Sequence, residues 1–174
     1  MVLVLWVVIM KSMAVKNRGF TLMELMIVVA IIMILAAVGF SNYIFSLKKS
    51  HDAARKSDLA TIAKGLEAFA NDFTDYPDDD DAGGIKACDS GSGLVACSWG
   101  DPMTAKPNGT AQTYLSRIPK DPVDGQYYYY IKTTDGFELY AGLENTSDPN
   151  YSEVEVSCGT NINCSYTLTQ AGVK

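Results

Sequence analysis

The feature that most constrains this chain is a run of 23 residues, from Leu25 to Leu47, that contains no charged side chain. At about 1.5 Å of rise per residue, a helix of this length measures about 34 Å, which is enough to cross the roughly 30 Å hydrocarbon core of a bilayer. One acid, Glu24, stands immediately before the run. We therefore expect a membrane-anchored chain, and the carboxylate at the start of its apolar helix needs an explanation.

The rest of the chain is polar and acidic. Residues 57–174 carry seven basic and 18 acidic side chains, a net charge of −11, and they are rich in Gly, Asn, Asp, Ser and Thr. A surface of this kind repels nucleic acid and attracts cations, so no nucleic-acid partner is expected for the chain alone. With 174 residues in all, the chain leaves room for one small, sheet-based head beside the anchor.

The four cysteines form two close pairs in the polar part, Cys88 with Cys97 and Cys158 with Cys164. Neither pair has the C-x-x-C spacing of a zinc or redox motif. If the head lies outside the cytoplasm, two local disulfides are expected, because they would staple loops that a thin core holds poorly. Four free thiols in a cytoplasmic head are the alternative.

One continuous helix is expected from Phe20 to about Phe73, since no proline occurs before Pro77. Beyond Lys56, its apolar residues step by three and four, which predicts an amphipathic helix lying against the head. The residues on this apolar face are Leu59, Ile62, Leu66, Phe69 and Phe73.

Strand patterns follow the helix. Tyr127–Thr133 and Phe137–Leu143, separated by Asp135-Gly136, predict a hairpin with one buried face. "EVEVS" and "SYTLT" predict two further short strands, whereas "AQTYLSRIPKDP" predicts a short helix or turn. The expected fold class is α+β: a long N-terminal α-helix, transmembrane and then amphipathic, packed on a small antiparallel β-sheet head.

Glu24 needs a partner, because a carboxylate at membrane depth costs about 2.5–3.5 kcal/mol on insertion scales. No Lys, Arg or His lies between Phe20 and Leu47. Cleavage after Gly19 would create a free amine on Phe20, one helical turn before the acid. That amine could pair with Glu24 of the same molecule or of a neighbour. The alternatives are a soluble coiled segment with an incidental acid and a plain single-span anchor with its head on either side.

The segment "KNRGFTLMELMIVVAIIMILAAVGF" resembles the class III signal of type IV pilins and type II secretion pseudopilins. Residues 54–77 and 114–143 also resemble the helix and the head hairpin of the major pseudopilins. The resemblance implies a pilin-like fold, cleavage by a prepilin peptidase after Gly19 and methylation of Phe20. It also implies that Glu24 engages the amine of an adjacent subunit during assembly. Two departures are the absence of a helix proline near Gly39 and the presence of two cysteine pairs.

On this resemblance the chain divides into four parts. Residues 1–19 are the prepilin leader, with Met13 as the expected start, and residues 20–47 are the transmembrane and assembly helix. Residues 48–76 are the amphipathic stalk helix, and residues 77–174 are the head.

The function expected is that of a structural subunit of a type IV filament, either a type IV pilus or a type II secretion-like pseudopilus. Expected partners are further copies of the chain, prepilin peptidase, an assembly ATPase with its platform membrane protein, and membrane lipid. The subunit would cross the cytoplasmic membrane once with its head outside, and then enter an extracellular or periplasmic filament. Alternatives are a monomeric membrane-anchored adhesin or receptor, and a competence-type pseudopilin for DNA uptake. Enzyme activity is not expected, because the single histidine, His51, lies on the stalk helix and no nucleophilic triad motif accompanies it.

Oxygen-bearing side chains gather in the loop "GLENTSDPNYSE", at Glu144, Asn145, Ser147, Asp148 and Asn150. The resemblance implies calcium binding in such a loop, with Glu144, Ser147 and Asp148 as candidate ligands. No cofactor is expected to be required, and a simply solvated acidic loop is the alternative.

Overall fold

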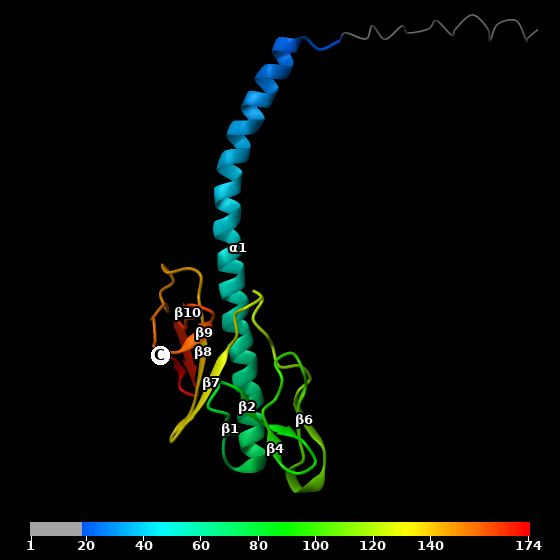
Figure 1. Ribbon diagram of the computed structural model, residues 1–174, viewed down its shortest axis with the longest axis vertical. Helices are drawn as coiled ribbons and strands as arrows, with labels where there is room; N and C mark the ends of the chain where they lie inside the picture. The colour runs from blue at the N-terminus through cyan, green and yellow to red at the C-terminus, as the bar shows by residue number, and fades with distance from the viewer. Residues whose placement is uncertain (1–18) are drawn as a thin grey trace, which may run out of the picture. The chain divides into compact units, whose positions relative to one another are not determined.

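The computed structural model of the chain describes residues 19–174, apart from the side chains of Val38 and Ser41 (Figure 1). The expected leader up to Arg18, with its start at Met13, lies outside the described residues. The chain divides into two units, one that ends at Tyr43 and one that comprises Ile44–Lys174.

The expectation of one long N-terminal helix is confirmed. Helix α1 comprises Leu22–Phe73 and belongs in part to each unit. After its last turn the backbone becomes left-handed at Thr74, where φ is 68°, and Pro77 follows shortly. Both features end helices, since a left-handed residue satisfies the last carbonyls and a proline cannot continue the helical hydrogen bonds.

In the first unit, α1 presents apolar side chains on all sides. Leu22, Ile34 and Phe40 are 76%, 67% and 68% exposed. Among residues 19–174, α1 is the one helix long and apolar enough to cross a bilayer. A helix that is apolar all round needs lipid or other helices as its surroundings.

In the second unit, the amphipathic face of α1 forms half of the core. Leu59, Ile62 and Leu66 are fully buried and Phe69 nearly so, as their spacing predicts. They pack with side chains of the sheet, among them Tyr130. Lys64 and Glu67, which the helical period places on the opposite face, are exposed.

The main sheet has four antiparallel strands in the order β12-β11-β8-β7. Their bounds are Tyr129–Thr133 for β7, Gly136–Ala141 for β8, Tyr166–Thr169 for β11 and Gly172–Val173 for β12. The expected hairpin is β7–β8, in register from Tyr129 opposite Tyr140 to Thr133 opposite Gly136. In Figure 1, β7 and β8 lie beside the C-terminal half of α1.

The expectation that the hairpin buries only one face is wrong. Tyr140 points away from the α1 side, yet it is buried in a second cluster with Cys158 and Cys164. Cys158 lies in β9, Ser157–Gly159, which pairs with β10, Ile162–Asn163, and Cys164 follows β10 directly. The second face of the sheet is therefore covered by a disulfide-bonded segment.

The residues between α1 and β7 form three two-stranded ladders. β1 (Asp78–Asp79) pairs with β2 (Ile85–Lys86), and β3 (Cys88–Asp89) pairs with β4 (Leu94–Val95). β5 (Met103–Ala105) pairs with β6 (Gln112–Leu115) across a 3₁₀ turn, η1, at Pro107–Gly109.

Two sequence predictions in the head differ from the structure. The helix or turn predicted for residues 111–122 is strand β6 over its first part, since Met103–Ala105 supplies a pairing partner that no local pattern reveals. Only the final serine of "EVEVS" lies in a strand. Val154 still donates its amide to the Cys164 carbonyl at 3.0 Å, which anchors the segment as irregular extended chain.

Both cysteine pairs form disulfides, Cys88–Cys97 and Cys158–Cys164, as the spacing indicates. Each closes a short loop in a region with few buried aliphatic residues. Disulfides of this kind persist in oxidising compartments, which fits a head outside the cytoplasm.

Gly65 allows α1 to approach strand β6 closely. A Cβ at this position would lie 2.5 Å from Leu115 Cγ. Helix propensity alone favours Gly65→Ala by about 1 kcal/mol, but the overlap should outweigh it and destabilise the head by about 1–3 kcal/mol. Thermal unfolding of Gly65→Ala, Leu115→Ala and the double variant tests this. Strictly additive losses in the double variant would contradict the proposed overlap.

Candidate assembly site

The N-terminus of α1 contains a capping box formed by Thr21 and Glu24. Glu24 Oε2 accepts hydrogen bonds from the Thr21 backbone amide at 2.9 Å and from Thr21 Oγ1 at 2.8 Å. In return, the Glu24 amide donates to Thr21 Oγ1 at 3.2 Å. A threonine followed three residues later by a glutamate satisfies amides that a helix start otherwise leaves without partners.

The capping box supplies a partner for Glu24 that the sequence reasoning missed. The motif T-x-x-E, at Thr21–Glu24 just before the apolar run, was the signal that could have revealed it. Glu24 is therefore hydrogen-bonded within its own chain before any cleavage occurs. An amine created at Phe20 would have to compete with this arrangement or add to it.

The predicted processing residues lie just outside the helix. Gly19 and Phe20 precede Leu22 in irregular backbone, and Phe20 is 90% exposed. No heavy atom within 4 Å would obstruct a Cβ at Gly19. The peptide bond between the two residues thus lies in exposed backbone, and both the cleavage after Gly19 and the Phe20–Glu24 charge pair stay predictions.

Replacing Thr21 with alanine should loosen the first turn of α1. Loss of an N-cap hydroxyl costs about 1 kcal/mol, which corresponds to about fivefold faster opening of the amides that follow. Hydrogen exchange of residues 22–26 in detergent micelles measures this opening. Thr21→Ser keeps the hydroxyl and should exchange like the native chain; equal exchange in the alanine variant would contradict the capping role.

A second cluster joins α1 to two loops of the head through the buried guanidinium of Arg55. Arg55 Nε and Nη2 donate to Asp121 at 2.8 and 3.0 Å, and Nη2 also donates to Gln126 at 3.0 Å. Nη1 donates to Asp52 at 2.9 Å and to Glu144 at 3.0 Å. Burial disfavours the charged form, but these hydrogen bonds and the Asp121 charge together raise the pKa of Arg55 above its usual value.

The three candidate calcium ligands do not converge on one point. Glu144 Oε1 is bound to Arg55 and lies 2.8 Å from His51 Nδ1. Ser147 is exposed, and its amide donates to Asn145 Oδ1. Both carboxylate oxygens of Asp148 accept hydrogen bonds from Lys56 Nζ at 2.7 Å.

These residues as placed do not fit a calcium ion. Calcium takes six to eight oxygen ligands at about 2.3–2.6 Å, and here an ammonium stands against the Asp148 carboxylate. Within residues 19–174, no group of three or more His, Cys, Asp or Glu side chains is arranged to hold a metal.

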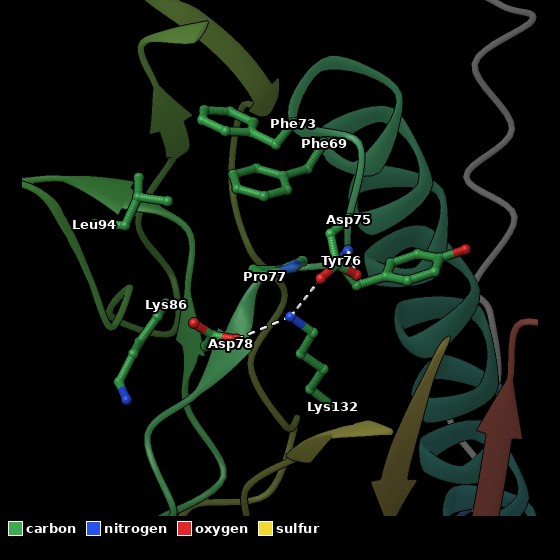
Figure 2. A pocket seen from close by; sticks show the side chains of 9 residues that line it. All are labelled: Phe69, Phe73, Asp75, Tyr76, Pro77, Asp78, Lys86, Leu94 and Lys132. Atoms are coloured by element: carbon green, nitrogen blue, oxygen red, sulfur yellow. Dashed lines mark hydrogen bonds and ion pairs between the residues drawn. The ribbon is translucent and has the colours of Figure 1, made fainter. Parts of the chain in front are cut away.

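A hollow lies where α1 ends and the chain turns at Asp75-Tyr76-Pro77 (Figure 2). Lys132 of β7 reaches into it and donates to Asp75 at 2.8 Å and to Asp78 at 2.9 Å. Its apolar wall includes Phe69 and Phe73, whose rings stack with centroids 4.2 Å apart. The contacts tie the turn after the helix to the sheet, so they are structural.

Acid should release the loop around Asp148. Hydrogen bonds from Lys56, and then from the Asn150 amide, hold the pKa of Asp148 below its usual value of 3.8. The stabilisation is therefore present above pH 3.8 and lost as the pH falls through the lower folded-state pKa. Asp148→Asn should unfold at a lower temperature at pH 7, and its melting temperature should fall less on acidification. An equal fall of the melting temperature in the native chain and in Asp148→Asn would contradict the stabilising role of the Asp148 carboxylate.

A capped acid at the start of an apolar helix, followed by an amphipathic half packed on a small antiparallel sheet, is the architecture of prepilin-like proteins. Residues 15–40 match the family model described as the prokaryotic N-terminal methylation motif. Relatives along most of the chain are named type II secretion system core protein G. The protein from Pseudomonas aeruginosa is 33% identical over 138 residues, covering 76% of this chain and 90% of that protein.

Two other relatives extend the comparison. The type II secretion system core protein G of Escherichia coli K12 is 30% identical over 112 residues, covering 64% of this chain and 70% of that protein. The type IV major pilin protein PilA of Myxococcus xanthus is 43% identical over 63 residues, covering 36% of this chain and 29% of that protein. No solved structure gives a significant match. The chain therefore belongs to the core protein G family of type II secretion, within the pilins and pseudopilins.

Proposed function

We propose that this chain is a structural subunit of a type II secretion-like pseudopilus, built in the manner of type IV filaments. The observation that carries the proposal is the position of Glu24. This acid is hydrogen-bonded in the first turn of an exposed apolar helix that needs lipid or other helices around it. Support also comes from relatives named for type II secretion that match most of the chain.

In this proposal, prepilin peptidase cuts after Gly19 and the amine of Phe20 becomes methylated. The subunit is anchored by one span with its head outside the cytoplasm, a placement that two disulfides favour. An assembly ATPase with its platform membrane protein then draws subunits from the bilayer into a filament. The side chain of His51 fits a structural role for the subunit, because its Nδ1 is hydrogen-bonded to Glu144.

The energetics of assembly give Glu24 its role. Each helix moves from lipid into a bundle of similar helices, so hydrophobic transfer provides little drive, and packing and polar contacts must select the register. The Glu24 carboxylate of one copy and the Phe20 amine of the next would exchange intrachain hydrogen bonds for an ion pair. Head-to-tail contacts of this kind do not close, so they produce an open filament.

Glu24→Ala should leave membrane insertion and cleavage intact but abolish filaments, because the new amine has no carboxylate to set the axial step. Electron microscopy of sheared filaments and mass spectrometry of the mature N-terminus report on the two steps separately. Glu67→Ala is the matched control, since Glu67 is exposed on the same helix within the head.

Normal filament yield from Glu24→Ala would refute the role of the acid. A mature protein that keeps residues upstream of Phe20 would refute the filament proposal as a whole and favour a monomeric membrane-anchored adhesin or receptor. A methylated Phe20 with filaments supports it.

A further inference from the structure

The loop after β8, residues 142–151, is fastened to α1 by basic side chains of the helix. Its first part is held through Glu144, which binds Arg55 and His51. Its second part is held through Asp148, which binds Lys56. The oxygen-rich loop thus meets three basic residues that one turn and a half of helix present side by side: His51, Arg55 and Lys56.

Asp148 is the centre of the second part of the loop. Besides Lys56, its carboxylate accepts the Asn150 amide at 3.0 Å. Its main chain is bonded as well, with the Asp148 amide donating to the Asn145 carbonyl and the Tyr151 amide donating to the Asp148 carbonyl. A cation that neutralises Asp148 therefore stabilises the turn from Asn145 to Tyr151.

The side chain of Lys56 is partly buried between the loop and the sheet. Its side chain is about one-quarter exposed, and the Asp148 carboxylate is 16% exposed, so water screens the pair incompletely. The ammonium also lies 5.4 Å from the ring centroid of Tyr166, a residue of the sheet. Its four-carbon stem thus crosses from α1 to the loop along the edge of the core.

The start of the loop is also bound through its backbone. Asp52, buried on α1, accepts the backbone amides of Glu144 and Asn145, both at 2.9 Å. Arg55 neutralises Asp52 through its hydrogen bond at 2.9 Å. Two backbone amides and two carboxylates of the loop, on both sides of Ser147, are consequently bound by residues of α1.

We propose that the Lys56 ammonium takes the place of a bound divalent cation in this head: it neutralises Asp148 and holds the oxygen-rich loop against α1. A metal ion at Asp148 would have to displace the ammonium or sit beside it against charge repulsion. The folding of the head is then independent of divalent cations. The proposal does not depend on filament formation, and it can be tested on the unassembled chain.

The test compares thermal unfolding of the full-length chain in detergent at neutral pH, with excess chelator or with millimolar calcium chloride. Potassium chloride keeps the ionic strength equal. The melting temperatures in the two conditions should agree within about 1 °C, and isothermal titration with calcium should give no saturable heat. Removing the ammonium should lower the melting temperature by about 3–5 °C in both conditions, as expected for a domain of this size.

Lys56→Met makes that removal while keeping an apolar stem, and Lys64→Met is its matched control. Lys64 is exposed on the same helix and has no ion pair within the described part of the chain. A saturable rise of the native melting temperature with calcium would overturn the proposal. Equal melting temperatures for the two variants would overturn it too. If Lys56→Met fails to fold, the calcium response of the native chain still decides the question.

Discussion

The buried guanidinium of Arg55 is the interaction on which the head depends. It binds Asp52 of its own helix, Asp121 and Gln126 before β7, and Glu144 after β8, so three separate segments meet at one cation. Removing one partner of a buried ion pair costs about 3–5 kcal/mol, because the other charge is left uncompensated. The loops that flank the hairpin are thus positioned by the helix, and helix and sheet form one core.

At the N-terminal end of α1, Glu24 is a charged group in an apolar segment. In the apolar half no cation is available between Phe20 and Leu47, and the acid at position 24 is instead satisfied by the threonine three residues earlier. A carboxylate bound in this way can enter a membrane at lower cost and remain exchangeable, since its partners are a hydroxyl and an amide without net charge. In the proposed assembly, the carboxylate would leave this cap for the amine of a neighbouring copy.

Periodicity predicted the long helix, its buried face at Leu59, Ile62 and Leu66, and the β7–β8 hairpin, because each is a local pattern of apolar spacing. Pairings between distant segments were not predictable, which is why β6 looked like a helix or turn. The partners of Glu144 and Asp148 lie about 90 residues away on α1, and no local pattern signals contacts of that separation. The capping box, by contrast, is a local pattern, because Thr21 and Glu24 stand three residues apart just before the apolar run.

The segment that carries Cys158 and Cys164, with Ile162 between them, covers the outer face of the sheet over Tyr140 and beside Ile131. The Cys158–Cys164 disulfide closes this short cover, which also pairs through β9 and β10 and keeps the aromatic and aliphatic side chains beneath it from solvent. A disulfide restricts the unfolded chain, so oxidation of the two thiols adds to the stability of a cover that backbone pairing already forms.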